Sequence, residues 1–299
     1  MFAYLIKSAK EVIFDIPLFF RAIFKVLIYL EKVERKVINM VFLTGDTHQK
    51  IDYAKLRKDN FGYHSHYEWD ELSRKDYLII LGDFGVIWNK PDEDEEFMIN
   101  FYNNFPATVC FIDGNHEGYT RLNSEFPEID FHGGRAHKIS DNIYHLMRGY
   151  VFDFDGKKFF AFGGASSHDI QDGILDPNDS LFWEKYGRLM NDPFSRFRVK
   201  GVSWWEEELP SEDEMIRGID NLEKVDYKVD FVISHCLPTF MLAAIYGSRG
   251  GYEIDKLNDY FNELYNNGLE FGKWYCGHYH IDWNFGDFVV MYDNIERVV

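Results

Sequence analysis

Five short apolar runs are spaced along the chain, and each ends in glycine or in polar residues. Each run is rich in β-branched and aromatic residues and is too short to form a core helix. A short apolar run bounded in this way predicts a buried strand rather than a helix. The five runs begin at Val41, Tyr77, Thr108, Asp230 and Lys273.

All five runs are followed by side chains that commonly bind metals. The first run ends in Gly45-Asp46-Thr47-His48, and the last ends in Gly277-His278-Tyr279-His280. In layered α/β proteins the binding site lies outside the carboxyl ends of the strands, so separate strand ends can bring such groups together. The candidate ligands are Asp46, His48, Asp83, Asn115, His235, His278 and His280.

The remaining pattern predicts helices and a second sheet around these strands. The dipeptide Asp155-Gly156 separates two further runs and is a strong hairpin signal, which predicts a second, antiparallel sheet layer. Ser211 and Glu214 form a capping-box pattern that starts a helix. Residues 169–210 lack periodicity, which is typical of a lid or an insertion. Helices are expected at 49–61, 92–105, 211–225 and 254–264, and strands at 141–147, 150–155, 158–162 and 288–292.

The composition describes a folded, acidic chain. Its 299 residues are 46% hydrophobic and 18% aromatic and contain no linker or repeat, which argues against disorder. The formal net charge of −18 disfavours a protein that binds nucleic acid or anionic lipid through general electrostatics, although a local cationic site could still attract phosphate. Three cysteines without close spacing favour a reducing, cytoplasmic setting.

Residues 1–39 differ from the rest of the chain, and we treat them as an extension of a domain that comprises residues 40–299. Seven Lys and Arg against four Asp and Glu give this segment a charge of +3 and leave −21 for the remainder. Its charges interrupt every apolar run before the ~18 residues that a spanning helix requires. An interfacial helix, a helix packed on the domain, and an upstream extension with translation starting at Met40 remain open. We favour the extension or a loosely attached helix over membrane association.

The seven candidate ligands can serve two metal ions. If Asp83 bridges, each ion receives four protein ligands. A mixture of imidazole and carboxylate favours Mn, Fe, Zn, Co or Ni over Ca or Mg, and we take Mn²⁺ as the first choice. Two divalent cations bring +4 and the carboxylates of Asp46 and Asp83 remove two, which leaves +2 for an incoming anion. Two metals ~3.5–4 Å apart can also lower the pKa of a shared water toward ~7, so that its hydroxide attacks phosphorus.

Other polar residues are candidates for catalysis or for contacts with substrate. His116 follows Asn115 but is not needed as a ligand, so it is the candidate acid or transition-state stabiliser. Asp113 is the candidate that orients His116. For the candidate substrate contacts, an exposed side chain without function is the favoured alternative. These candidates are Arg121, His168, Arg188 and Arg249.

The ordered motifs around these residues resemble the complete motif set of the calcineurin-like metallophosphoesterases. The resemblance extends from Met40 to the carboxyl terminus and implies an α/β fold, a four-layer αββα sandwich in which helices flank two mixed β-sheets. It also implies a dinuclear metal centre at the strand ends and a catalytic role for His116. One metal would be bound by Asp46, His48, Asp83 and His280, and the other by Asp83, Asn115, His235 and His278.

One motif departs from the protein Ser/Thr phosphatases and the dinucleoside tetraphosphatases. Those enzymes read Gly-Asp-x-Val-Asp-Arg-Gly, whereas this chain reads Gly-Asp-Phe-Gly-Val-Ile-Trp from Gly82 to Trp88 and lacks the arginine that binds phosphate. A protein phosphatase is therefore disfavoured. The segments from Gly163 to Ser167 and from Trp204 to Glu207 are similar to those of a small bacterial and phage branch of unassigned substrate.

The sequence therefore predicts a hydrolase that acts on phosphate mono- or diesters of a small molecule or nucleotide. Attack by a hydroxide held between two metals and assistance from His116 would provide the mechanism. A nuclease acting on DNA or RNA is the main alternative, but it would need a basic groove that a charge of −21 over residues 40–299 does not favour. A binding scaffold without turnover is the third class, and the intact ligand set argues against it.

Overall fold

The structure, a computed structural model, describes residues 39–246 and 254–299. The predictions for residues 1–38 and for Arg249 lie outside these ranges. Asn39–Val299 forms one compact unit. Within the part of the chain that the structure describes, no helix combines the length and the hydrophobicity needed to cross a bilayer.

The first sheet contains three of the five predicted apolar strands. β1 (Val41–Thr44), β2 (Tyr77–Leu81) and β3 (Thr108–Ile112) lie side by side and parallel, so that their carboxyl ends meet at one edge. The sheet has the order β15-β1-β2-β3-β6-β5-β4 and is mixed, because β15 pairs antiparallel with β1 and β5 pairs antiparallel with both β6 and β4. Its other strands are β15 (Ile295–Arg297), β6 (Ile143–Leu146), β5 (Gly134–Lys138) and β4 (Glu128–Phe131).

The second sheet contains the other two predicted strands in the order β13-β14-β12-β11-β8-β7. The predicted hairpin is confirmed, because β7 and β8 pair antiparallel through a turn in which both Asp155 and Gly156 have positive φ. The expectation of an antiparallel layer is wrong for most of the sheet, since β8, β11, β12 and β14 run parallel. The strands are β7 (Tyr150–Phe154), β8 (Lys157–Phe162), β11 (Lys228–Ser234), β12 (Glu270–Cys276), β13 (Trp283–Phe285) and β14 (Phe288–Val290).

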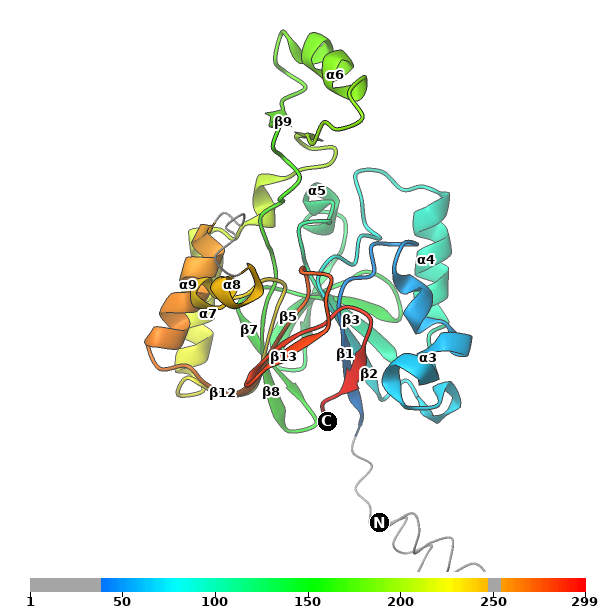
Figure 1. Ribbon diagram of the computed structural model, residues 1–299. Coiled ribbons are helices and arrows are strands. Elements are labelled where there is room, and N and C mark those ends of the chain that lie inside the picture. The colour runs from blue at the N-terminus through cyan, green and yellow to red at the C-terminus, as the bar shows by residue number, and fades with distance from the viewer. Residues whose placement is uncertain (1–38, 247–253) are drawn as a thin grey trace, which may run out of the picture. The chain divides into compact units, whose positions relative to one another are not determined.

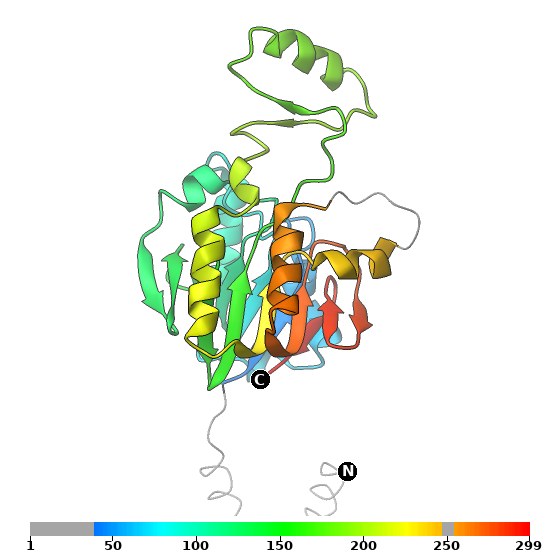
Figure 2. The same ribbon diagram turned by 90° about the vertical axis from the view of Figure 1, so that its left-hand side faces the viewer.

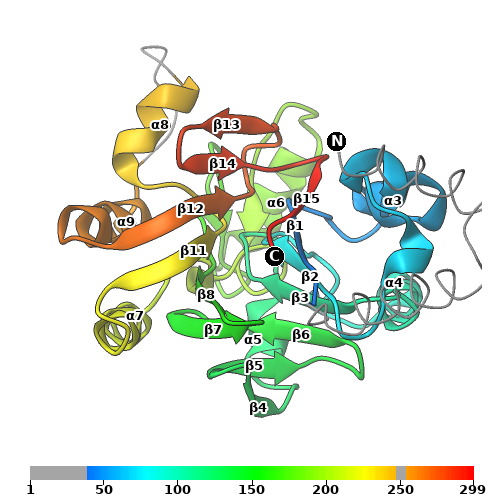
Figure 3. The ribbon, with the colours of Figure 1, turned by 90° about the horizontal axis from the view of Figure 1, so that it is seen from below.

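The two sheets face each other, and helices cover their outer faces (Figure 3). Val41 and Leu43 of β1 point into the core between the sheets, whereas Phe42 packs with the helices outside the first sheet. Burial on both faces explains why the central strands are continuous apolar runs without alternation. The helices outside the first sheet are α3 (Lys58–Ser65) and α4 (Glu93–Asn103), and those outside the second are α7 (Glu212–Glu223) and α9 (Lys256–Asn266).

Local capping explains where most of these helices begin. The capping box predicted for α7 is present, with Ser211 and Glu214 hydrogen-bonded to each other's backbone N–H. Asp255 caps α9 in the same way. The helix expected at 49–61 is wrong in position, because Gln49 has a positive φ and a turn precedes the 3₁₀ helix η2 (Tyr53–Leu56) and then α3.

Residues 169–205 form a segment that projects from the body on the side of the strand carboxyl ends (Figures 1 and 2). It holds the short parallel pair β9 (Ile174–Leu175) and β10 (Arg198–Val199) and the helix α6 (Phe182–Met190). Four residues of these elements form a small apolar cluster of their own, namely Leu175, Phe182, Leu189 and Val199. The predicted insertion is therefore an ordered element with its own small core.

Candidate metal centre

The ends of four strands, β1, β2, β11 and β12, bring six of the seven candidate ligands into two groups. Ligand atoms of the first group, which includes Asp46 and His280 from opposite ends of the chain, all lie within 4.8 Å of one another, and the same limit holds within the second group. Asp83 belongs to both groups, so its two carboxylate oxygens can serve two ions. The first group is Asp46, His48, Asp83 and His280, and the second is Asp83, His235 and His278.

The imidazoles of these groups face the carboxylates at hydrogen-bonding distance. His48 Nε2 lies 3.1 Å from Asp83 Oδ2, and His235 Nε2 lies 3.2 Å from Asp83 Oδ1. His280 Nε2 lies 3.1 Å from Asp46 Oδ2. Donor atoms from separate strands therefore converge on two adjacent points, as a pair of cation sites requires.

Several buried donor atoms lack a hydrogen-bond partner among the described residues. Both amide atoms of Asn115 are buried in this state, whereas Oδ2 of Asp46 and Nε2 of His235 have the contacts with His280 and Asp83 given above but no bond of good hydrogen-bond geometry. A buried polar atom without a partner costs about 1–3 kcal/mol, and coordination of a cation would satisfy such atoms. Asn115 is the seventh candidate ligand and follows β3, next to His116, whose backbone N–H donates to Asp83 Oδ1 at 2.8 Å. The residues present therefore fit a metal centre.

Backbone turns aim the ligands. His48, Asp83, His278 and His280 have positive φ values of 40°, 48°, 71° and 51°. This left-handed region is uncommon for residues other than glycine and is concentrated at functional sites. Gly114 has to be a glycine, because a Cβ there would lie 2.2 Å from Asp83 Oδ1. The positive φ values and the glycine at position 114 thus allow the ligands to approach one another closely.

Hydrogen bonds behind the ligands fix which ring nitrogen faces the centre. His235 Nδ1 donates to the carbonyl of Leu81 at 2.7 Å, and His48 Nδ1 lies 2.7 Å from Asp52 Oδ2. With Nδ1 engaged, Nε2 is the coordinating nitrogen in both rings. The backbone N–H of His278 donates to Asp46 Oδ1 at 3.0 Å and orients that carboxylate.

The carboxylates also control the charge of these histidines. Burial lowers the pKa of His48, but the hydrogen bond to Asp83 and the charges of Asp83 and Asp46 outweigh it and raise this pKa to about 9. The pKa of His235 is likewise raised to about 9, again because Asp83 and Asp46 outweigh burial. Burial favours the neutral form of Asp83, yet the charges of His235 and His116 hold its pKa well below its usual range. In the metal-free protein, two imidazolium cations therefore neutralise the carboxylates, and a metal would displace these protons.

His116 lies at the edge of the centre. Its ring centroid is 5.0 Å from that of His48 and 6.3 Å from that of Trp88, which stacks on it at 19°. Burial lowers the pKa of His116 to about 4, with the positive charges of Arg198 and His48 adding to this effect and Asp83 opposing it. The ring is therefore neutral at neutral pH.

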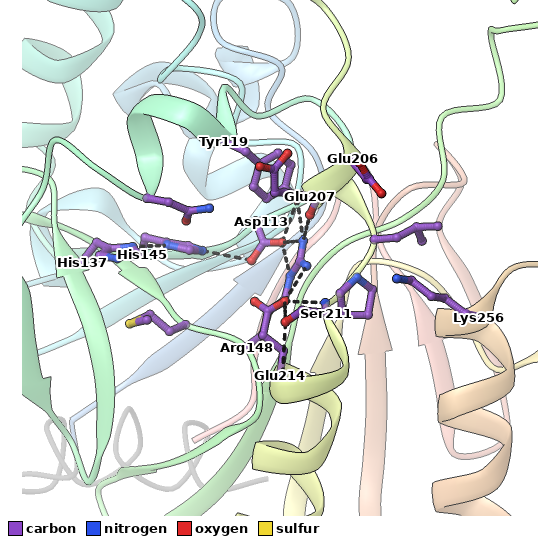
Figure 4. A pocket seen from close by; sticks show the side chains of 14 residues that line it. Asp113, Tyr119, His137, His145, Arg148, Glu206, Glu207, Ser211, Glu214 and Lys256 are labelled. Atoms are coloured by element: carbon purple, nitrogen blue, oxygen red, sulfur yellow. Dashed lines mark hydrogen bonds and ion pairs between the residues drawn. The ribbon is translucent and has the colours of Figure 1, made fainter. Parts of the chain in front are cut away.

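The expected orientation of His116 by Asp113 is not formed. Asp113 is buried and accepts hydrogen bonds from Arg148 Nε at 2.7 Å and Tyr119 Oη at 2.8 Å, and it lies 3.0 Å from His145 Nε2. These residues line a cavity of about 460 Å³, to whose lining none of the seven candidate ligands belongs (Figure 4). The reason is electrostatic, since the buried guanidinium of Arg148 requires a counterion. Burial is the largest influence on the pKa of Asp113 and would raise it, but the charge of Arg148 and the hydrogen bond from His145 hold it well below the usual range.

The candidate substrate contacts differ in position. Arg121 is buried and binds Glu95 through both terminal nitrogens and Glu125 through Nε, so its charge is already compensated by protein groups. Arg188 is exposed on α6 in the projecting segment. His168 is exposed, and its ring centroid lies 5.7 Å from that of His278. Of these three residues, His168 is the one whose ring lies beside a ligand.

Three residues support the site in ways that the sequence did not predict. Arg198 contacts His116, with its Nη2 3.1 Å from the ring Nε2. Lys55 is buried and donates to the carbonyl of Asp46 at 2.8 Å. Glu117, in the loop between β3 and the helix that begins at Tyr119, is buried and accepts from the N–H of Phe84 at 2.8 Å. Glu117 directly follows the candidate His116 in the sequence, whereas no local pattern marks Arg198 or Lys55.

Comparison of the sequence with models of known protein families and with curated proteins finds no match in either set.

Proposed function

We propose that this protein is a metal-dependent phosphoesterase of the calcineurin-like type, with two divalent cations, Mn²⁺ preferred, at the ends of the five strands. The observation that carries the proposal is the position of Asp83, which belongs to both ligand groups. The two facing mixed sheets with outer helices are consistent with the αββα sandwich that the sequence motifs resemble.

The proposed reaction is hydrolysis of a phosphate ester. Water oxygen bonds to phosphorus, the ester P–O bond breaks, and the leaving oxygen takes up a proton. Bound divalent cations would supply Lewis acidity, which attracts phosphate oxygens and makes water a nucleophile near neutral pH. Asp46 and Asp83, both buried, would hold the cations through their carboxylates.

His116 would stabilise the departing oxygen by a hydrogen bond. It lies next to the ligand groups without belonging to either. Because Arg198 donates to its Nε2, the ring proton of the neutral form resides on Nδ1, and Nδ1–H is the group that it can offer. A positioned proton donor of this kind contributes about 10²–10⁴-fold to a rate.

A metal-by-substrate screen on the full chain tests the proposal. We expect Mn²⁺-dependent hydrolysis of p-nitrophenyl phosphate or bis(p-nitrophenyl) phosphate, and single-stranded DNA is included to detect a nuclease. Asp83→Asn should lower turnover by at least about 10²-fold, because the neutral amide cannot bridge two cations. His66→Gln is the matched control, since His66 is exposed and remote from the ligand groups. Unchanged Mn²⁺-dependent hydrolysis in Asp83→Asn would contradict the mechanism.

A further inference from the structure

Arg198 is a buried arginine in the projecting segment, and it contacts the loop after β3 that contains Asn115 and His116. It is 5% exposed and follows the turn that returns from α6 to the body. A guanidinium has five N–H donors. Hydrogen bonds engage all five donors of Arg198: Nε and Nη2 with Asp169, Nη1 with the carbonyls of Asn115 and Ser203, and Nη2 with His116.

These contacts make Arg198 a positioning group rather than a free phosphate clamp. Its Nε donates to Asp169 Oδ1 at 2.6 Å and its Nη2 donates to Asp169 Oδ2 at 3.1 Å, which is a bidentate pair. The pair fixes the plane of the guanidinium. Nη1 then reaches the carbonyl of Asn115 at 3.3 Å, in the same loop as His116.

The contact with His116 determines the tautomer of that ring. Arginine has no acceptor, so His116 Nε2, 3.1 Å from Nη2, has to be the unprotonated nitrogen. The ring face is held by Trp88, which stacks on it. Asp113, the carboxylate that was expected to orient His116, is engaged by Arg148 instead. Arg198 therefore takes the orienting place that a carboxylate would otherwise occupy.

We infer that Arg198, held by Asp169, is a positioning residue of the active site, which fixes His116 so that its Nδ1–H faces the leaving oxygen of the phosphate ester. This inference rests on the proposed function and deepens it. It also makes the base of the projecting segment a part of the site. The segment is then linked to turnover through one side chain.

Replacement of Arg198 by methionine tests the inference by kinetics. Arg198→Met should lower kcat by about 10²-fold, the effect of misplacing a catalytic group, with KM changed less than about threefold. The loss should be largest for esters with poor leaving groups, such as phenyl phosphate, and small for p-nitrophenyl phosphate, which needs little help at the leaving oxygen. Arg198→Lys should recover little, because one ammonium cannot replace a planar fork. A merely structural role would lower all substrates equally.

Arg196→Met is the matched control. Arg196 is exposed in the same segment, two residues before Arg198, and it binds Asp172 through its backbone N–H rather than through its side chain. Its kinetics should equal those of the wild type. If Arg198→Met fails to fold, Asp169→Asn decides, since this half-exposed side chain can change without opening the core and should show the same leaving-group trend to a smaller degree.

A second readout does not depend on turnover. Nitrogen-15 NMR of the Zn²⁺-loaded full chain should show His116 with Nδ1 protonated and Nε2 unprotonated, and Arg198→Met should shift it toward the other tautomer. If no ester is hydrolysed but this tautomer is found, the proposed function fails while the positioning of His116 stands. A wild-type His116 protonated at Nε2, or variants with unchanged tautomer and unchanged leaving-group dependence, would overturn the inference.

Discussion

Removal of metal should leave a protein whose stability falls as the pH rises above neutrality. His48 and His235 have pKa values of about 9 in the folded, metal-free protein, against 6.5 when unfolded, because Asp83 and Asp46 outweigh the effect of burial. A group whose folded pKa is raised contributes stability that is fully present below its unfolded pKa and is lost as the pH rises through its folded pKa. The window for these two histidines therefore runs from pH 6.5 to about pH 9.

The magnitude follows from proton linkage. Between pH 6.5 and about pH 8 the unfolded imidazoles lose their protons, whereas the folded ones keep them. At about 1.4 kcal/mol per proton and pH unit, each histidine accounts for roughly 1.5 kcal/mol over this interval. Both imidazoliums pair with Asp83, so their contributions are not additive, and we expect a total loss of about 2 kcal/mol.

The interval is limited to about pH 8 because of Lys55. Burial lowers the pKa of its amine to about 8, against 10.5 when unfolded, despite the opposing charge of Asp46. A depressed pKa contributes stability that is present above the unfolded value and is lost as the pH falls through the folded value. Lys55 therefore adds stability as the pH rises above about 8, and this gain would mask the loss of stability that the two histidines cause.

Urea unfolding of chelator-treated protein at pH 6.5 and about pH 8 measures this loss. Asp83→Asn removes the shared carboxylate and should flatten the pH dependence, whereas His66→Gln, at an exposed position, should leave it unchanged. Added Zn²⁺ should reverse the trend, because coordination requires deprotonated imidazoles and so tightens with pH. A chelated wild type that is equally or more stable at about pH 8, or an equal slope in Asp83→Asn, would refute the reasoning.

Two further substitutions test other parts of the structure. Gly114→Ala would place a Cβ 2.2 Å from Asp83 Oδ1, so we expect at least one metal per chain to be lost by elemental analysis; Gly187→Ala, with open space around it in α6, should keep full metal content. Arg148→Met leaves the buried carboxylate of Asp113 uncompensated and should lower the free energy of unfolding by about 3–5 kcal/mol, measured in urea. A cost below about 1 kcal/mol would show that Asp113 finds another partner.

The local sequence was sufficient to predict the candidate ligands, because these residues lie directly after the strands. Each of the seven candidate ligands lies within four residues of the end of its strand, where the chain has few ways to direct a side chain. Because parallel strands end at one edge of a sheet, the convergence of these ligands could be expected from the sequence. Their division into two groups that share Asp83 was expected only from the resemblance to the metallophosphoesterases. The capping box of α7 and the Asp155-Gly156 turn were predictable for the same reason, since each depends on bonds within a few residues.

Other elements depend on contacts between distant parts of the chain. The start of the helix after β1 was misplaced because Thr47 and His48 bind the carbonyl of Asp83, which holds the chain in a turn. Asp113 was assigned to the wrong partner because Arg148 is 35 residues away in sequence, and a buried cation takes the nearest carboxylate in space. No local sequence pattern predicts either the turn after β1 or the pairing of Arg148 with Asp113.

The sequence by itself determined the strands, the ligand types and their order, because hydrophobic runs and the turns that end them are local properties of the chain. Only the tertiary structure decided which side chain supports His116 and the loop around Asn115. Arg198 and Asn115 are 83 residues apart and meet because the projecting segment returns to the body at that point. Long-range packing, rather than any motif, therefore placed a guanidinium against His116.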